Sequence, residues 1–417
     1  MTWARFVLLA VIAAILCAGA VALLSRTPAS VRGAKPDTEE RSAANGASFS
    51  DTQIARHGAY RRPNYVAFFL SALLTIIVLV LIGRGPFSSL VDRTSGWPGG
   101  WFVQAMFFGA LLTALLALVA LPLGFITGFV IQHAWDLSNQ SVGAWLTDQL
   151  RFLAIGGVIS AVSAAAFFGI VRWKPDTWWL WGWAAFSLLT VALVFLFPVV
   201  IAPLFNRFTP LEEGPLRTEI IRLGDAAGVP LDEVLVADAS KRSSAENAYV
   251  AGLGATKQLV LYDTLLEAGT EEETLFVVAH ELGHKAENHV LKNVVISSVG
   301  LLVGFGLLFL LSKRQSVWVA AGAEGIGDVR ALPLLVLFLT VMTLLVAPIE
   351  SGISRHFERQ ADSAAIALTD DPVAGVSTFR RLAFSNLADL RPPAFLVGFL
   401  FSHPPIPDRI ESLVTRE

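Results

Sequence analysis

The chain contains few cysteines and few charged residues. Its 417 residues include one cysteine, Cys17, and Asp, Glu, Lys and Arg together make up 16% of the sequence. A single cysteine excludes an intramolecular disulfide and a metal site built from cysteines. The formal net charge is −3 and no basic stripe with interleaved aromatics is present, so the sequence provides no electrostatic case for nucleic acid binding. Hydrophobic residues make up 54% and the mean hydropathy is +0.61, which is typical of a membrane protein.

Seven apolar runs are long enough to cross a bilayer. They are predicted at residues 3–24, 65–83, 101–131, 152–171, 178–201, 294–311 and 332–347. The first run (1–24) also has features of a signal peptide, but its length favours an uncleaved anchor. Residues 25–64 are polar, rich in Ala, Gly and Ser, and contain seven basic residues, so we expect a flexible basic linker.

The distribution of basic residues predicts the orientation in the membrane. With the N-terminus outside, the first inside loop holds the seven basic residues of 25–64, whereas the next outside loop holds Arg84 and Arg93. This asymmetry predicts a C-terminus on the cytoplasmic side, together with the long polar section 206–293. Most basic residues are arginine, and alanine and glycine are abundant, which indicates a GC-rich bacterial genome and hence a bacterial plasma membrane.

A metal-binding pattern lies in the long polar section. His280 and His284 are four residues apart in a predicted helix (267–293), so both imidazoles project from one face and can reach one zinc ion. Glu281 would lie beside the open position of the ion, where it can take a proton from water and pass it to a leaving amine. The pattern predicts peptide-bond hydrolysis by a zinc enzyme; the alternative is a helix with ordinary surface histidines.

A third ligand is needed, and two candidates follow the last apolar run. The metzincin class is excluded because Val290 stands where its third histidine should be. Residues 353–362 predict a helix in which Glu358 and Asp362 share a face, so Glu358 can bind the metal while Asp362 accepts a hydrogen bond from a ligand imidazole. His356 is the rival ligand, about 120–200° away around the helix. The alternative is an exposed amphipathic turn.

The sequence around these motifs predicts a small catalytic domain at the membrane surface. Section 206–293 contains a predicted helix at 216–227 and predicted strands at 233–238, 248–252 and 258–262. The metal helix runs almost directly into the sixth apolar run, which places the metal near the bilayer. We therefore expect a mainly α polytopic membrane protein with a small α+β metalloprotease domain. Its parts would be spans two to five at 65–205, the catalytic domain at 206–293, spans six and seven at 294–350, and a C-terminal catalytic part at 351–417.

Several motifs together resemble those of one family. They are Ile201-Ala202-Pro203-Leu204-Phe205-Asn206, Ser240-Lys241-Arg242-Ser243-Ser244, Asn247-Ala248-Tyr249, Leu261-Tyr262-Asp263-Thr264-Leu265-Leu266, the zinc motif, Ser354-Arg355 with Glu358, Ala361-Asp362, and Ser402-His403-Pro404-Pro405 with Arg409. Over nearly its whole length the chain resembles the type I CAAX prenyl proteases, integral-membrane zinc metalloproteases with seven spans. The resemblance implies one zinc ion per chain, bound by His280, His284 and Glu358, with Glu281 as general base. It also implies a chamber enclosed by the transmembrane helices.

The resemblance gives roles to three further segments. His403 and Arg409 would line the site, where they stabilise the oxyanion, or where the arginine holds a substrate carboxylate or Asp362. The strand beginning at Asn247-Ala248-Tyr249 would pair its free edge with an extended substrate; the alternative is an ordinary buried strand. Residues 132–136 depart from the acidic, histidine-containing segment common in the family, so the lining of the chamber and the choice of substrate are expected to differ.

The favoured function is an integral-membrane zinc endopeptidase of the CAAX prenyl protease type, which removes C-terminal residues from prenylated proteins. Its partners would be hydrophobic or membrane-associated peptides and proteins and the lipid bilayer. One alternative is a broader metalloprotease for quality control of membrane proteins, against which the seven spans and the closing His-Pro-Pro segment argue. The other is a catalytically idle zinc-bound scaffold or transporter, which the presence of Glu281 and the scarcity of intramembrane charges disfavour.

Overall fold

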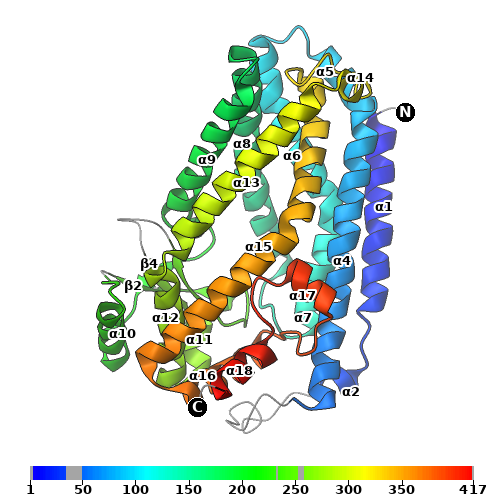
Figure 1. Ribbon diagram of the computed structural model, residues 1–417. Helices are drawn as coiled ribbons and strands as arrows, with labels where there is room; N and C mark the ends of the chain where they lie inside the picture. Colours follow the sequence, from blue (N-terminus) through cyan, green and yellow to red (C-terminus); the bar gives the residue numbers. More distant parts are fainter. Residues whose placement is uncertain (1–2, 34–48, 232, 252–257, 416–417) are drawn as a thin grey trace.

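A bundle of long helices forms most of the molecule (Figure 1). The computed structural model describes residues 3–33, 49–231, 233–251 and 258–415. Within these residues seven helical segments are long and apolar enough to cross a membrane: Trp3–Leu24, Asp51–Gly83, Gly100–Ala134, Val142–Trp173, Trp178–Leu204, His289–Ser312 and Val329–Thr369. The prediction of a mainly helical polytopic membrane protein with seven spans is confirmed. The enclosed chamber stays a prediction.

The spans correspond to numbered helices in Figure 1. These are α1 (Trp3–Leu24), α4 (Asp51–Gly83), α6 (Gly100–Phe125) with α7 (Ile131–Ala134), α8 (Val142–Trp173), α9 (Trp178–Leu196), α13 (His289–Ser312) and α15 (Leu332–Thr369). Short π-helical turns, Ile126–Val130 and Phe197–Ile201, interrupt the third and fifth spans. Large apolar side chains, among them Phe87, Phe108, Phe168 and Trp318, pack into one buried cluster at the end of the bundle where the chain starts. This end also carries α5 (Pro86–Arg93) and α14 (Gln315–Val319).

Helix α4 begins well before the predicted second span. Ser50 caps it: its hydroxyl accepts a hydrogen bond from the backbone N–H of Gln53, whose side chain accepts one from the N–H of Ser50. This reciprocal capping box fixes the start of the helix at Asp51. The expected flexible linker is therefore wrong for residues 51–64, and Ala29–Arg32 form a short helix, α2. Residues 34–48 of the expected linker lie outside the described residues.

The polar part of α4 is helical because its side chains bind another segment. His57 Nδ1 lies 2.6 Å from the carbonyl oxygen of Ala388, and Arg61 Nε donates to the carbonyl of Leu387 at 2.7 Å. Tyr65 donates its hydroxyl to Asp389 at 2.8 Å. These partners replace water, so a sequence that is polar enough for a linker forms an ordered helix against the catalytic part.

Helix α15 carries the last span and the predicted third ligand without a break. Its 38 residues correspond to about 57 Å, well beyond the roughly 30 Å of a bilayer core. The predicted boundary between residues 350 and 351 therefore falls inside one helix. Glu358 and Asp362 therefore lie on the same helix as the last membrane span.

A small sheet lies at the far end of the bundle from the N-terminus. Its strands are β1 (Phe208–Pro210), β2 (Val234–Ala237), β3 (Ala248–Ala251) and β4 (Gln258–Tyr262), in the order β1-β2-β4-β3. Strands β2 and β4 are parallel and the other pairs antiparallel. The three predicted strands are confirmed, as is the helix α10 (Pro215–Ala226). Strand β1 was not predicted, because three residues that end in proline carry no recognisable alternation.

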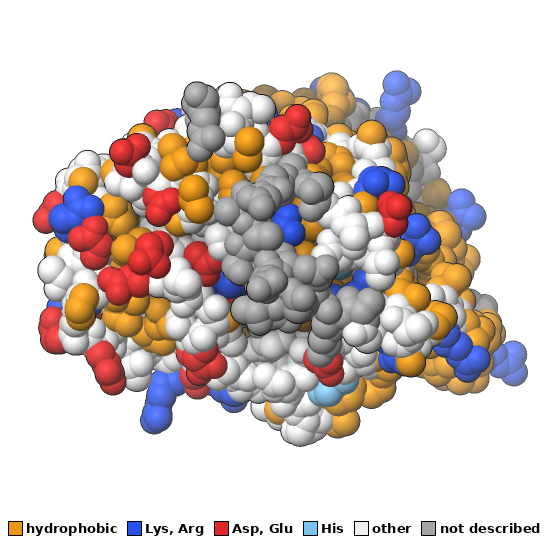
Figure 2. Space-filling model, turned by 90° about the horizontal axis from the view of Figure 1, so that it is seen from below, with side chains coloured by type: hydrophobic (Ala, Val, Ile, Leu, Met, Phe, Trp, Pro, Cys, Tyr) orange, Lys and Arg blue, Asp and Glu red, His pale blue; other side chains and the backbone are white. Residues whose placement is uncertain are grey.

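The remaining α-helices are α11 (Asp263–Ala268), α12 (Glu271–Ala286), α16 (Pro372–Ser385), α17 (Ala394–Leu400) and α18 (Ile406–Val414). Helices α11 and α12 contact the sheet, α16 packs against α12 and α18, and α17 lies against α15. Helix α12 ends at Ala286, and Asn288, with a φ of 55°, turns the chain into α13, so the metal helix leads almost directly into the membrane as predicted. Figure 2 shows acidic and basic side chains spread over this end of the molecule, which indicates that it lies in water.

Candidate metal centre and active site

Helix α12 presents the two histidines of the motif to α15. Thr270 and Glu273 form a capping box that fixes its start. Gly283 allows the close approach: a Cβ there would lie 3.1 Å from Cα of Ala361 and 2.8 Å from Cβ of Ala364. The glycine between the two histidines therefore lets α15 pack directly against the metal-binding face.

The structure brings His280, His284 and Glu358 together, and each offers one ligand atom to a common point. The Nε2 atoms of His280 and His284 are 3.1 Å apart. Glu358 Oε2 lies 3.4 Å from His280 Nε2, and Glu358 Oε1 lies 3.3 Å from His284 Nε2. Ligands at about 2.0–2.1 Å from a tetrahedral zinc ion are spaced by about 3.4 Å, so the three side chains fit such an ion.

Two further observations favour a cation at this point. Glu358 Oε2 is buried and accepts no hydrogen bond from the described residues, although its side chain is almost entirely removed from water. Burial disfavours a charged His280, but the nearby carboxylates of Asp362 and Glu358 outweigh this effect and raise the pKa of His280 to about 10. The carboxylates thus favour positive charge at this position, which a bound metal ion would supply with the imidazoles neutral.

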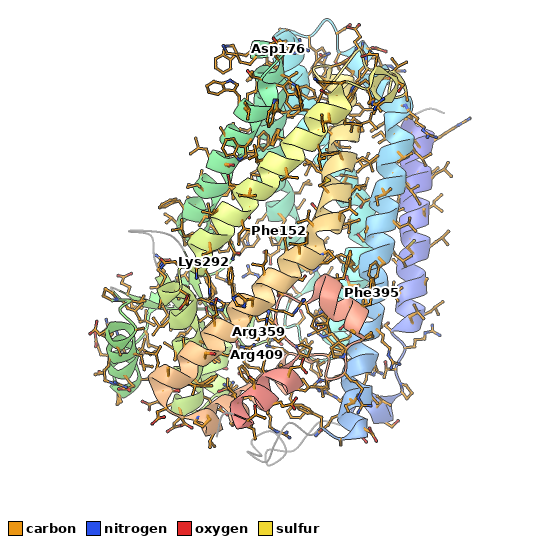
Figure 3. The ribbon with its side chains drawn as sticks, in the orientation of Figure 1. Phe152, Asp176, Lys292, Arg359, Phe395 and Arg409 are labelled. Atoms are coloured by element: carbon orange, nitrogen blue, oxygen red, sulfur yellow. The ribbon has the colours of Figure 1, made fainter. Side chains whose placement is uncertain are left out.

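Asp362 and Arg409 lie on the side of His280 that faces away from the metal position. Asp362 Oδ1 lies 2.9 Å from His280 Nδ1, in position to accept its N–H and leave Nε2 free for a metal. Arg409 donates to both oxygens of Asp362, at 2.9 and 2.5 Å, and its guanidinium lies 4.1 Å from the ring centre of Phe379. Figure 3 shows Arg409 on α18 below α15. Of the roles that the sequence suggested for Arg409, holding Asp362 is the one that this geometry supports.

The second histidine has a support that the sequence analysis missed. His284 Nδ1 lies 2.9 Å from His289 Nδ1, and His289 Nε2 lies 3.0 Å from Gln360 Oε1. With protons on His284 Nδ1 and His289 Nε2, every hydrogen bond in this chain is satisfied and His284 Nε2 is free. His289 is buried and stacks on Phe357 at 4.2 Å between ring centres. The short spacing between His284 and His289 can be seen in the sequence. Their hydrogen-bonded link to Gln360 cannot, because Gln360 lies on another helix.

Glu281 and His403 lie next to the position that a metal ion would occupy. Glu281 follows His280 and is half-buried, and burial raises its pKa above the usual glutamate value, although the charges of His280 and His284 offset part of this effect. His403, in the loop before α18, is 59% exposed, and its Nε2 lies 3.3 Å from Glu358 Oε1. Both side chains can therefore reach a molecule bound at the metal position.

Other predicted residues lie farther from this point. His356, the rival ligand, is exposed on α15 and borders a surface cavity with Glu287 and Arg359. In the sheet, Asn247 is exposed before β3 and Ala248 is buried against α12, whereas the Tyr249 ring faces Tyr262 at 6.2 Å on the other side. Strand β3 pairs only with β4 among the described residues, so its second edge has no strand partner there.

Comparison with known proteins identifies the family. Residues 38–207 match the family described as CAAX prenyl protease N-terminal, five membrane helices, and residues 210–417 match peptidase family M48. The chain is 32% identical to the metalloprotease YhfN of Bacillus subtilis over 384 residues, 90% of this chain and 89% of that protein. It is 32% identical to CAAX prenyl protease 1 of Saccharomyces cerevisiae over 328 residues, 74% and 72% of the two chains.

The fold is also similar to that of a solved relative. The crystal structure of S. mikatae Ste24p matches with a TM-score of 0.78 and 26% identity, covering 98% of this chain and 99% of that one. The chain belongs to peptidase family M48, with the N-terminal membrane domain of the CAAX prenyl proteases. It is a multi-pass integral-membrane metalloprotease of the CAAX prenyl protease type, and this family implies a bound metal ion.

Proposed function

We propose that the metal is one zinc ion per chain, bound by His280, His284 and Glu358. The cluster of these three side chains, with Glu281 beside it, is the observation that carries the proposal. Two imidazoles and one carboxylate are a typical donor set of catalytic zinc sites, which keep one position open. Zinc bound there supplies Lewis acidity, which polarises the scissile carbonyl and makes water acidic near neutral pH.

Glu281 is the general base in this proposal. Its carboxylate takes a proton from the water whose oxygen attacks the carbonyl carbon of the scissile peptide bond. The same proton then goes to the amide nitrogen as the C–N bond breaks, so the products are an amine and a carboxylic acid, which loses its own proton to water at neutral pH. The half-buried setting of Glu281 raises its pKa, which makes it a stronger base than an exposed glutamate.

His403 and Arg409 have different tasks. His403 is exposed and lies beside Glu358. In this position its imidazole can donate a hydrogen bond to the oxyanion that develops on the carbonyl oxygen of the scissile bond. Arg409 is 9% exposed, and two of its nitrogen atoms donate to Asp362. We therefore assign Arg409 a positioning role: it orients Asp362, which in turn fixes the ring of His280.

Substrate would bind along the free edge of β3. Peptide groups alternate in direction along a strand, and the N–H of Tyr262 donates to the carbonyl of Asn247 at 3.0 Å. Asn247 and Tyr249 therefore direct their peptide groups to β4, whereas Ala248 and Val250 direct theirs to the free edge. Backbone pairing there would align an extended substrate without reference to its side chains.

The proposed substrates are the C-termini of prenylated or otherwise membrane-associated proteins, cleaved on the cytoplasmic side of a bacterial plasma membrane. The catalytic end also carries the basic N-terminal part of α4, with Arg56, Arg61 and Arg62, and cytoplasmic ends of membrane proteins are enriched in basic residues. The name of the yeast relative, CAAX prenyl protease 1, supports the same class of substrate.

The test is cleavage of a farnesylated CAAX peptide and its unprenylated twin by purified protein, with Glu281→Gln and zinc chelation as controls. The proposal expects selective cleavage of the prenylated peptide, abolished by both controls. Equal cleavage of both peptides would instead establish a broader membrane protease. Cleavage of neither by a protein that binds zinc stoichiometrically would overturn the proposal and favour the scaffold.

A further inference from the structure

Arg355 belongs with Glu358 to a motif of the sequence, yet the proposed function assigns it no task. It lies on α15, three residues before Glu358, and its side chain is half-buried. Its Nη1 donates to the carbonyl oxygen of Val397 at 2.7 Å and to that of Phe401 at 2.8 Å. One nitrogen thus binds two backbone groups in the segment that leads to His403.

These bonds lie at the C-terminal end of α17. Figure 3 shows this helix, which carries the labelled Phe395, beside α15. The last carbonyl groups of an α-helix have no partner within the helix and need donors from elsewhere. Arg355 supplies the donor for Val397, and the hydroxyl of Ser351, one turn earlier on α15, donates to the carbonyl of Phe399 at 3.3 Å. Because a charged donor forms a stronger hydrogen bond than a neutral one, Arg355 is the main attachment of this end of α17 to α15.

Packing gives the same segment little support. No residue of α17 is buried, and the chain from Phe401 to Pro405 contains no helix or strand. His403 lies within this stretch and is 59% exposed. Pro404, directly after it, is buried, and Arg355 binds the chain two residues before it. The position of His403 is therefore fixed between two points, of which the bond to Arg355 is one.

The contacts of the His403 ring show why its position matters. Its Nε2 lies 3.3 Å from Glu358 Oε1, and its Nδ1 lies 2.9 Å from the hydroxyl oxygen of Ser402. When Ser402 donates this hydrogen bond, the neutral ring carries its proton on Nε2, the nitrogen that faces the reaction centre. Because Arg355 and Glu358 lie on one helix, a bond that fixes the main chain next to His403 also fixes its ring relative to Glu358.

We infer that Arg355 is a positioning residue for the reaction: by binding the main chain next to His403, it holds the imidazole where it donates to the oxyanion. The inference rests on the proposed function, in which His403 has that task. A displacement of about 1 Å near a reacting centre can cost about 100-fold in rate. Loss of the two bonds should therefore lower kcat about 10–100-fold and leave KM within about twofold, since the contact is made only in the transition state.

The first experiment measures cleavage of the farnesylated CAAX peptide by Arg355→Met, which keeps most of the length of the side chain but removes its donors. Arg359→Met is the matched control, because Arg359 is exposed on the same helix and its replacement should leave kcat and KM within about twofold. A higher KM at unchanged kcat in Arg355→Met would overturn the inference, since the guanidinium would then bind substrate. Unchanged kinetics in a folded Arg355→Met would overturn it as well.

A double-mutant cycle with His403→Ala separates positioning from general support of the fold. His403→Ala should lower kcat about 10²–10³-fold, the cost of one oxyanion donor. Adding Arg355→Met should then lower kcat by less than about twofold, because no ring remains to be positioned. The same loss in both backgrounds would make the role of Arg355 structural and overturn the inference.

Binding of a phosphinic peptide gives a readout without turnover, because its tetrahedral phosphinate resembles the oxyanion. It should bind to Arg355→Met about 10–100-fold more weakly than to the wild type, but equally to His403→Ala and to the double variant. If Arg355→Met does not fold, Arg355→Gln, which is shorter and uncharged, carries the same expectations. His403→Ala that cleaves as fast as the wild type would overturn the oxyanion role in the proposed function, and this inference with it. A slow His403→Ala beside a fast Arg355→Met would overturn the inference alone.

Discussion

Replacing Asp362 by asparagine tests whether the chain Arg409–Asp362–His280 tunes the metal site. The substitution keeps the shape of the side chain but removes the negative charge that accepts from His280 Nδ1 at 2.9 Å and from Arg409 at 2.5 Å. Partners of this kind typically contribute 10–100-fold to metal affinity. We therefore expect zinc to bind about 10–100-fold more weakly in Asp362→Asn, equivalent to about 1.4–2.8 kcal/mol.

The assay is competition for zinc between the purified protein and a chromophoric chelator at fixed pH. Asp148→Asn is the matched control, because Asp148 is buried, pairs with Arg242 at 2.7 Å and is not part of the metal cluster. Both variants remove the nearest charge partner of an arginine, so both should lower the melting temperature, and the effect should be larger for the more buried Arg409. A folded Asp362→Asn that binds zinc within about twofold of the wild type would refute the reasoning.

The other predictions concern the general base, the rival ligand and the missed histidine. Glu281→Gln should lower kcat by about 10²–10⁴ while zinc content measured by atomic absorption is unchanged; loss of the metal would contradict the role of a base. Because burial raises the pKa of Glu281 and the base must be ionised, kcat/KM should decline as the pH falls through a value above that of an ordinary glutamate, and an acid limb at the ordinary value would refute this. His356→Ala should leave zinc affinity and kcat unchanged, since its ring is exposed; weaker zinc binding in chelator competition would restore it as a ligand. His289→Ala should weaken zinc binding by about tenfold, because His284 loses the acceptor that orients its ring, and an unchanged affinity would exclude that role.

The sequence alone was informative where structure depends on local pattern. Apolar length located the seven spans, and the alternation in 233–238 and 258–262 located two strands of the sheet. The spacing of His280 and His284 identified one face of a helix, and the same argument placed Glu358 and Asp362 together on another. The structure brings these two faces together, while the roles of the residues remain predictions to be tested.

Tertiary structure decided what the polar side chains bind. Residues 51–64 have the composition of a linker, yet they form a helix because their partners are carbonyl groups of residues 387 and 388, more than three hundred positions away. Arg409 pairs with Asp362 and His289 with Gln360 only because α18, α13 and α15 meet around one point. A hydrogen-bonding group leaves no periodic trace of its distant partner in the sequence. The spans and the metal motif could therefore be predicted from the sequence, whereas the hydrogen-bonding partners of His280 and His284 could be identified only in the folded chain.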